Sequence, residues 1–136
     1  MAQCVFCRIA SHGIPAAMVL ETEQAVSFLD INPVNPGHAL VVPRRHASSL
    51  LELTDEELHT LITMARRVAA AACGATGSRA FNILQNDGEA AGQVVPHAHL
   101  HVIPRSPKDG FSFGWRQLPY GEGELSALQQ AVRQRL

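Results

Sequence analysis

Short apolar runs separated by polar, glycine or proline residues dominate the first third of the chain. Residues 18–21 and 25–30 are predicted strands, and the polar residues 22–24 between them predict a hairpin. Residues 38–43 form another apolar run, which predicts a mostly buried strand. Residues 31–37 hold two prolines and a glycine, so we expect a loop there instead of a regular ladder.

The apolar positions change to helical spacing after residue 53. Thr54 and Glu57 stand at the spacing of a capping box, in which each side chain bonds the other residue's backbone N–H. The pattern predicts a long helix that starts at Thr54, covers one sheet face and ends near Gly74 or Gly77. About one turn of helix is expected before it, over residues 47–53. The apolar stripe comprises Leu58, Leu61, Ile62, Ala65, Val68, Ala69 and Ala72.

Two further predicted strands flank a glycine-containing turn. Residues 78–86 and 95–104 are the apolar segments, and residues 87–93 connect them. Strand, turn and strand in this order predict an antiparallel hairpin. The whole pattern predicts an α+β fold, in which helices pack on an antiparallel sheet of about five strands.

The chain after Arg105 has a different composition. Residues 106–121 are rich in proline, glycine and aromatic residues, which predicts an ordered loop. Trp115 and Tyr120 could cover a ligand or pack on a second subunit, but burial in the core is the commoner fate of single aromatic residues. Apolar residues at helical spacing then predict a C-terminal helix that closes the domain. They are Leu125, Leu128, Val132 and Leu136.

Length and charge narrow the class of protein. With 136 residues, 46% of them hydrophobic, the chain is long enough for one domain with a core. A formal charge of −1 gives no bulk attraction to nucleic acid or membranes, so any phosphate site must be built locally. No apolar run is long enough to cross a bilayer, and the first residues lack the features of a signal peptide. We therefore expect a cytoplasmic protein whose three cysteines stay reduced.

Three histidines at alternate positions, His97, His99 and His101, are the strongest chemical signal in the chain. Side chains two apart on a strand share a face, so these imidazoles should point one way and the apolar residues between them the other. A lone histidine on a strand is usually an ordinary polar residue, but burying three unpartnered imidazoles is costly. A bound metal ion would account for them, and so would an anion held beside a nucleophilic ring nitrogen.

The sequence from His97 to Ile103 resembles the motif of the histidine triad (HIT) family, His-φ-His-φ-His-φ-φ with φ apolar. The resemblance covers roughly residues 4–105. It implies a single HIT domain over residues 1–136, with residues 106–136 as an added loop and helix. It also implies a two-fold homodimer, joined through the long helix and the strand beside it. The other matching segments are Asp30-Ile31, Pro36-Gly37-His38, Asn86-Asp87-Gly88 and Gly92-Gln93.

For function, the resemblance implies a nucleotide hydrolase or transferase that works through a covalent intermediate. His99, the middle histidine, would attack the α-phosphorus of a nucleotide conjugate, and water would then release the nucleoside monophosphate. His97, His101 and His38 would complete the catalytic group, with His38 lying beside the triad. The displacement itself needs no metal ion. The implied substrate-binding residues are Asp30, Ile31, Asn86, Gly92, Gln93, Val94 and His101.

Val94 departs from the family pattern. Several relatives have Ser or Thr there, whose hydroxyl helps the leaving group depart, whereas valine has no proton to give. A phosphate leaving group needs less protonation than an amine, so Val94 favours dinucleoside polyphosphates over nucleoside phosphoramidates as substrates. From the residues alone, Asp30 could instead cap its loop, and residues 87–93 could be a plain connector.

Cys4 and Cys7 form a Cys-x-x-Cys pair, which can offer two thiolates to one metal ion from a tight turn but is only half a site. Two buried small residues would explain the pair as well, and a redox role lacks the thioredoxin-like strand and helix around it. The resemblance implies that His46 and His97 complete a closed structural zinc site, which would not activate water. His12 is a lower-ranked alternative ligand.

Two other classes of function stay open at this stage. One is a zinc hydrolase, in which the three histidines would hold a metal-bound water. Against it, the histidines lie two apart on one strand, and the cysteines are available for the metal. The other is a non-catalytic module that binds a nucleotide or a partner protein. A small-molecule nucleotide is the expected ligand, and neither nucleic acid nor a membrane is an expected partner.

Overall fold

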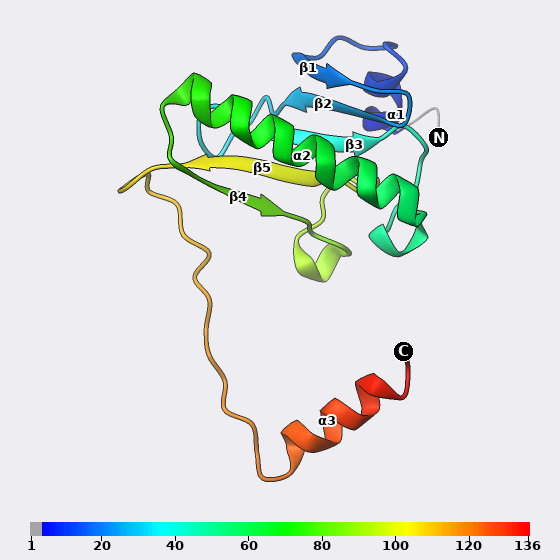
Figure 1. Ribbon diagram of the computed structural model, residues 1–136, viewed down its shortest axis with the longest axis vertical. Helices are drawn as coiled ribbons and strands as arrows, with labels where there is room; N and C mark the ends of the chain where they lie inside the picture. The colour runs from blue at the N-terminus through cyan, green and yellow to red at the C-terminus, as the bar shows by residue number, and fades with distance from the viewer. Residues whose placement is uncertain (1–3) are drawn as a thin grey trace.

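Five strands form one antiparallel sheet, which confirms the predicted fold class. A computed structural model describes residues 4–136, and residues 1–3, considered above for a signal peptide, lie outside the described part. The strands are β1 (Met18–Glu21), β2 (Ala25–Leu29), β3 (Ala39–Pro43), β4 (Ala80–Leu84) and β5 (Leu100–Arg105). Their order across the sheet is β1-β2-β3-β5-β4. Both predicted hairpins are present, β1 with β2 and β4 with β5 (Figure 1).

The long helix α2 (Asp55–Thr76) packs across one face of the sheet, as its apolar stripe predicts (Figure 1). It starts with the predicted capping box, because Thr54 and Glu57 each accept a hydrogen bond from the other's backbone amide. It ends at Gly77, which is left-handed. Most of the stripe lies in the core, but Ile62 is half exposed. The 3-10 turns are η1 (Leu50–Glu52), where one helical turn was predicted, and η2 (Glu89–Ala91).

A short helix on the opposite face is the main element that the sequence did not predict. α1 (Val5–Ala10) begins directly after Cys4, where a tight turn was expected. Phe6 and Ile9 of this helix pack in a second core cluster with side chains from β2 and β3. Their i, i+3 spacing is the signal of a one-sided helix. Cys4 is thus the N-cap of α1, and Cys7 lies in its first turn.

The triad segment alternates as predicted but is only partly strand. β5 contains His101, whereas His97 and His99 precede it. The chain turns before the strand, where the His97 amide donates to the Val95 carbonyl at 2.8 Å. The apolar residues between the histidines pack in the core under α2. His97 and His99 face the other way and meet the ring of Phe6 edge to face.

The loop of residues 31–37 passes between the end of α2 and β5. Gly37 has a φ of +85°, and a Cβ on it would lie 3.0 Å from Thr76 Cγ2 and 3.1 Å from Pro104 Cγ. Glycine therefore serves both the backbone conformation and the close approach. Beyond the short pairing of β3 with β5, the Asn35 side-chain amide donates to the Pro104 carbonyl at 2.9 Å. The loop thus covers the part of β5 that β3 leaves open.

Residues 106–136, called the arm below, extend away from the sheet and end in α3 (Glu124–Arg133) (Figure 1). No residue of α3 is buried, so the expectation of a helix that closes the domain is wrong for the single chain. The expected core burial of Trp115 and Tyr120 is also wrong, because both are exposed, Trp115 to 86%. Helical spacing predicts an apolar stripe but not the surface on which it packs. Within the described residues, no helix has the length and apolar character of a membrane span.

Candidate active site and metal centre

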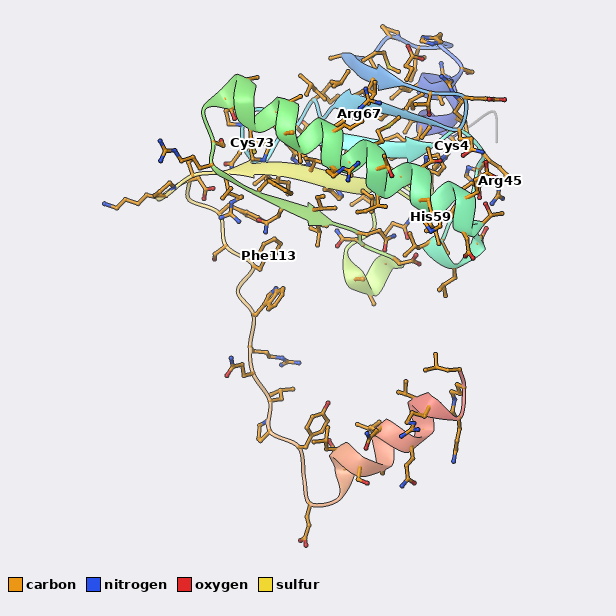
Figure 2. All side chains as sticks on the ribbon, in the orientation of Figure 1. Cys4, Arg45, His59, Arg67, Cys73 and Phe113 are labelled. Carbon is orange, nitrogen blue, oxygen red and sulfur yellow. The ribbon has the colours of Figure 1, made fainter. Side chains whose placement is uncertain are left out.

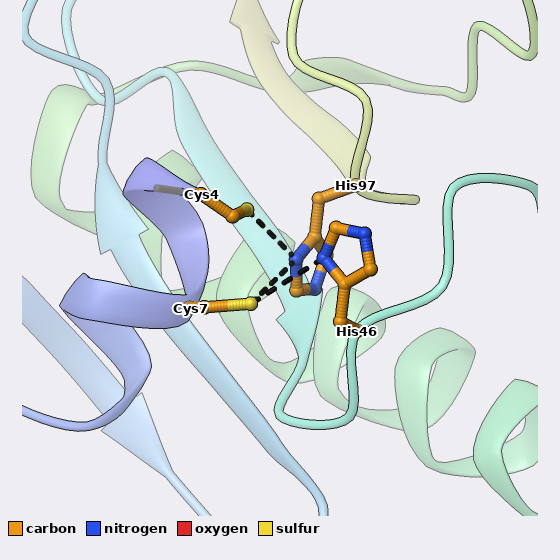
Figure 3. A group of neighbouring side chains, drawn as sticks. All are labelled: Cys4, Cys7, His46 and His97. Atoms are coloured by element: carbon orange, nitrogen blue, oxygen red, sulfur yellow. Dashed lines mark hydrogen bonds between the residues drawn. The ribbon is translucent and has the colours of Figure 1, made fainter. Parts of the chain in front are cut away.

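Four sulfur and nitrogen ligands converge from separate segments of the chain (Figure 3). Cys4 and Cys7 come from the start of α1, His46 follows β3, and His97 precedes β5. The Sγ atom of Cys7 lies 3.4 Å from Nδ1 of His46 and 3.5 Å from Nδ1 of His97. The Sγ atom of Cys4 lies 3.4 Å from the same His97 nitrogen. The structure thus brings together the four residues predicted as metal ligands.

The distances within this quartet fit one tetrahedral ion. Zn–S bonds of about 2.3 Å and Zn–N bonds of about 2.05 Å place sulfur and nitrogen about 3.6 Å apart at the tetrahedral angle. Burial raises the pKa of the Cys7 thiol, and a hydrogen bond with Cys4 raises it further, so the protonated thiol is favoured when no cation is bound. A cation bound by both sulfur atoms would reverse this preference and stabilise the thiolates. Two thiolates with two imidazoles are typical of a closed structural site. The alternative ligand His12 instead pairs with Glu21 at 2.8 Å.

His97 takes part in both halves of the site. Its Nε2–H donates to the Pro43 carbonyl at 2.8 Å, which leaves the Nδ1 lone pair facing the cysteines. Its backbone carbonyl accepts a hydrogen bond of 2.6 Å from Nδ1–H of His99. Because a carbonyl can only accept, a backbone oxygen fixes the tautomer of each ring.

His99 presents its second nitrogen, Nε2, as a lone pair. His99 as a residue is 6% exposed, and the edge-to-face contact of its ring with Phe6 has a centroid distance of 5.0 Å. Burial lowers the pKa of His99, although the hydrogen bond to the His97 carbonyl works in the opposite direction. The ring is therefore neutral at neutral pH and is held in one orientation, as nucleophilic catalysis requires.

His38 and His101 form a directed pair. The Val34 amide donates to Nδ1 of His38 at 3.0 Å, so the His38 proton is on Nε2. That Nε2–H donates to Nδ1 of His101 at 2.9 Å, which puts the His101 proton on its Nε2. Burial, with smaller contributions from His99 and His38, lowers the pKa of His101 to about 4. The ring centroids of His99 and His101 are 4.9 Å apart, so the ring with the open Nε2 lies next to the ring that carries a proton on Nε2.

Asp30, His38 and His101 bring a second set of ligand atoms together. Their hydrogen bonding does not fit a metal ion, because the His38 Nε2 proton is shared with His101 and a cation would have to displace it. Asp30 accepts from the Asn32 amide through Oδ1, and its Oδ2 lies 3.7 Å from His38 Nε2. The loop-capping alternative is therefore present, beside the histidine pair. Ile31, the predicted neighbour in the nucleoside pocket, is exposed.

The loop between β4 and β5 is held by hydrogen bonds of Gln93, within the loop and to Ser48 before η1. Gln93 accepts from the Gly88 amide at 2.7 Å and donates to two backbone carbonyls, so its side chain holds the loop. Gly92 has a φ of +96°, a conformation that favours glycine, and lies against the Asn86 side chain. Its own amide is engaged within the loop. Val94 is almost fully exposed. A cavity of about 620 Å³ beside the loop is lined by Gly88, Glu89, Gly92, Gln93, Val94 and Pro96.

Two contributors to the site were missed in the sequence. Phe6 contacts the rings of both His97 and His99, at centroid distances of 5.9 and 5.0 Å. The i, i+3 spacing of Phe6 and Ile9 was the available signal for its burial. The Pro43 carbonyl fixes the His97 ring, and no sequence pattern indicates it.

Known proteins share this architecture over nearly the whole chain. The family model described as "HIT domain" matches residues 11–108. Adenosine 5'-monophosphoramidase hnt1 of Schizosaccharomyces pombe is 36% identical, over 98% of this chain and 98% of its own. The crystal structure of a HIT family member from Bacillus subtilis gives a TM-score of 0.91 at 37% identity, covering 98% of this chain and 97% of that one. A zinc-bound histidine triad family protein from Mycobacterium smegmatis gives 0.78 at 38% identity, covering 98% and 96%. By sequence and by fold, the chain belongs to the HIT-domain family.

Proposed function

We propose that the protein is a nucleotide hydrolase that cleaves nucleoside 5′-phosphate conjugates at the α-phosphorus through a covalent nucleotidyl-His99 intermediate. The observation that carries the proposal is the state of His99, a buried neutral ring whose proton is held on Nδ1 by the His97 carbonyl. Its Nε2 lone pair is then available on a fixed ring. The relative from S. pombe is named as an adenosine 5'-monophosphoramidase, which supports a reaction of this class.

The reaction has two displacements at phosphorus. In the first, the His99 Nε2 lone pair forms a bond to the α-phosphorus, and the leaving group departs with the electrons of its own bond. The resulting charged ring is stabilised through its Nδ1–H on the His97 carbonyl. In the second, a water oxygen bonds to phosphorus, and the P–N electrons return to Nε2. Nucleoside monophosphate leaves, one water proton is released, and neutral His99 is restored.

Negative charge on the phosphoryl oxygens requires hydrogen-bond donors beside His99. The His101 Nε2–H is the best candidate, since its pair with His38 fixes the tautomer. The Asn86 side-chain amide is a second candidate. The Gln93 side chain is bonded to the Gly88 amide and to the Ser48 carbonyl, and the Gly92 amide is bonded within the loop, so we infer that both residues shape the site and do not contact the phosphate directly.

The choice of leaving group follows from proton supply. His101, with a pKa of about 4, is neutral at neutral pH and donates a hydrogen bond without being a strong acid. Val94 has no hydroxyl to add. An amine must gain a proton to leave, whereas phosphate leaves as an anion. We infer that anhydrides, including dinucleoside polyphosphates, react faster than phosphoramidates in this protein.

We also infer that the quartet of Cys4, Cys7, His46 and His97 holds a structural zinc ion. The donor set and its spacing support this, as does the zinc-bound relative from M. smegmatis. When bound, the ion would tie α1 to the triad segment and would supply no chemistry to the displacement. The reaction needs no other cofactor.

A homodimer in the cytoplasm completes the proposal. β4 is an edge strand with a half-exposed Phe81, and Ile62 is half exposed on α2, so the two elements named by the family resemblance offer apolar surface. Three free thiols suit a reducing compartment. Sedimentation should give the mass of a dimer for the native chain and of a monomer for Phe81→Asp.

The zinc hydrolase and the non-catalytic binding module are the two alternative classes of function. Hydrogen bonds argue against the first, and a turnover assay tests the second. A zinc hydrolase is disfavoured because the three triad rings are directed to three different partners. His97 faces the cysteines, His99 the His97 carbonyl, and His101 the ring of His38. A non-catalytic binding module would share this geometry but would show no turnover, so the assay decides.

The test is to trap the intermediate. Protein mixed with a diadenosine polyphosphate or with adenosine 5'-monophosphoramidate is quenched in alkaline denaturant, and the adduct is located by mass spectrometry. Fragmentation should place the nucleotide on His99. An adduct on another residue, or turnover that never produces an adduct, would contradict the proposal.

A series of leaving groups tests the specificity. Rates should rise with leaving-group acidity in the native protein. Val94→Ser should speed the phosphoramidate more than the anhydride, while Val94→Ala controls for the loss of bulk. Equal acceleration of both substrates would contradict the inference from proton supply.

A further inference from the structure

Asp109 is a nearly buried carboxylate at the root of the arm, outside the histidine site. Its side chain is 8% exposed and accepts two hydrogen bonds from Arg105, at 2.7 and 3.1 Å, and one from Asn35 at 2.9 Å. The amides of Ser106 and Phe111 also donate to it. These hydrogen bonds hold the pKa of Asp109 well below its usual range, and those from Arg105 contribute most. A carboxylate with this many directed donors has a specific position.

The turn around Asp109 is held in an unusual conformation. Lys108 has a φ of +60°, in the left-handed region that favours glycine. Arg105 also donates to the Phe111 carbonyl, and its guanidinium lies 4.7 Å from the centroid of the Phe111 ring. The root of the arm is therefore fixed, and the ring of Phe113, labelled in Figure 2, packs edge to face on that of Phe111 with a centroid distance of 5.0 Å.

Asn35 connects this turn to the loop before His38. Both hydrogens of its Nδ2 are used, one on Asp109 and one on the Pro104 carbonyl. Its backbone carbonyl accepts from the His38 amide at 3.1 Å. One residue earlier, the Val34 amide donates to Nδ1 of the His38 ring. The position of Asn35 therefore controls the backbone on both sides of the bond that sets the His38 tautomer.

We propose that Asp109 is a positioning residue for the catalytic pair, because it holds Asn35, and thereby the loop that fixes His38 and His101. The inference rests on the proposed function, in which the His101 Nε2–H meets a phosphoryl oxygen. When Asp109 no longer holds Asn35, the Val34 amide shifts and the His38 proton is no longer confined to Nε2. His101 then loses the donor that orients its ring. A change at the root of the arm would therefore alter the orientation of the His101 ring, which meets the phosphate in the proposed mechanism.

The experiment compares turnover and ring protonation in the full chain. Asp109→Asn keeps the side-chain size but replaces an acceptor atom by a donor. At a temperature where the variant is fully folded, kcat should fall about 10-fold while KM changes less than about twofold, because alignment is lost and binding is kept. Nitrogen NMR should show one His38 tautomer in the native protein, with the proton on Nε2, and a mixture in the variant.

A second variant and a matched control guard the interpretation. Asn35→Ser removes the link but leaves the pair of Asp109 with Arg105, so it should produce the same two changes if Asp109→Asn fails to fold. Glu57→Gln breaks a similar two-bond pair, with Arg45 at 2.7 and 2.8 Å, in a separate network. It should leave kcat and the His38 signals unchanged.

The outcomes separate this inference from the proposed function. Native kcat and a single His38 tautomer in both variants would overturn the inference, and so would an equal loss of kcat in Glu57→Gln. A fall in kcat with an unchanged His38 tautomer would overturn the route through His38. If the native protein has no turnover, the proposed function fails, and the His38 signals alone still decide whether Asp109 holds the ring.

Discussion

Two clusters of imidazoles draw on one short segment of this chain, and we propose different tasks for them: the metal cluster would hold zinc, and the catalytic cluster would attack phosphorus. In the metal cluster, His97 gives its Nε2–H to the Pro43 carbonyl and turns its Nδ1 lone pair toward two cysteines. In the catalytic cluster, His99 gives its Nδ1–H to the His97 carbonyl and keeps Nε2 open. Only one residue separates His97 from His99 in the sequence. The two rings differ in which nitrogen donates its hydrogen to a backbone carbonyl.

The comparison shows that burial alone does not assign the role of a histidine. Burial is the main cause of the lowered pKa of both His97 and His99. The surroundings of the two rings differ, since cysteine sulfur atoms face the open nitrogen of His97, whereas the His99 ring lies next to the imidazole of His101. Backbone acceptors therefore select the tautomer, and the surrounding side chains select the chemistry.

Substitution of the nucleophile should produce the largest difference between the clusters. His99→Ala is expected to lower kcat by at least about 10³-fold, because it removes the ring whose Nε2 lone pair attacks phosphorus in the proposed mechanism. Zinc content should stay at the native level, since His99 is not among the quartet. Steady-state kinetics and elemental analysis measure the two effects. Retention of most turnover would remove His99 from its proposed role.

Removal of the metal should give the opposite pattern. Chelation, or Cys7→Ser, is expected to lower the free energy of unfolding by about 3–4 kcal/mol, the stabilisation given by a ligand at 100 to 1,000 times its Kd. Turnover measured at once, below the melting temperature, should persist. Cys73→Ser is the matched control and should change neither quantity. Immediate loss of turnover on chelation would favour a metal-bound water instead.

A pH series should isolate the catalytic cluster. The pKa of His101 is about 4 in the folded chain, against an ordinary 6.5, so between these values only the unfolded chain takes up this proton. The free energy of unfolding should therefore fall as the pH is lowered from 6.5 to 4. Replacing His101 with Asn should reduce the fall between pH 7 and pH 5 by roughly 1 to 2 kcal/mol. Urea unfolding at the two pH values measures this, and equal slopes would contradict it.

His12 should give the smallest effect on either cluster. Its ring pairs with Glu21 at the surface and lies outside the quartet. His12→Ala is expected to leave zinc affinity and kcat unchanged, and to alter stability by less than about 0.5 kcal/mol, as surface substitutions usually do. A competition titration with a zinc chelator is the measurement. A weaker affinity would restore His12 as a ligand.

Most of the sheet was predictable because its strands carry strong local signals. The capping box at Thr54 and the apolar stripe after it indicated α2, and the turns at 22–24 and 87–93 indicated both hairpins. α1 was missed because six residues give too little periodicity beside a Cys-x-x-Cys pair. The arm was misjudged for another reason. Its apolar stripe was real, but a stripe does not name the molecule on which it packs.

The residues of the candidate site could be predicted from the sequence, but the hydrogen bonds that hold them in place could not. Spacing and family resemblance indicated the quartet, and the structure brings its members within ligand distance. Neither could indicate that the Gln93 side chain is engaged by the Gly88 amide and the Ser48 carbonyl. Asp109 lies beyond the segment of resemblance, and its five donors come together only in three dimensions. Contacts of this kind depend on backbone geometry and leave no pattern in the chain.

The arm also determines how this protein looks in a fluorimeter. The chain has one tryptophan and one tyrosine, Trp115 and Tyr120, and both lie on the arm. Intrinsic fluorescence therefore reports on the arm and gives no direct signal from the sheet or its histidines. A blue shift on raising the protein concentration would report that the arm has found an apolar surface, with no label added.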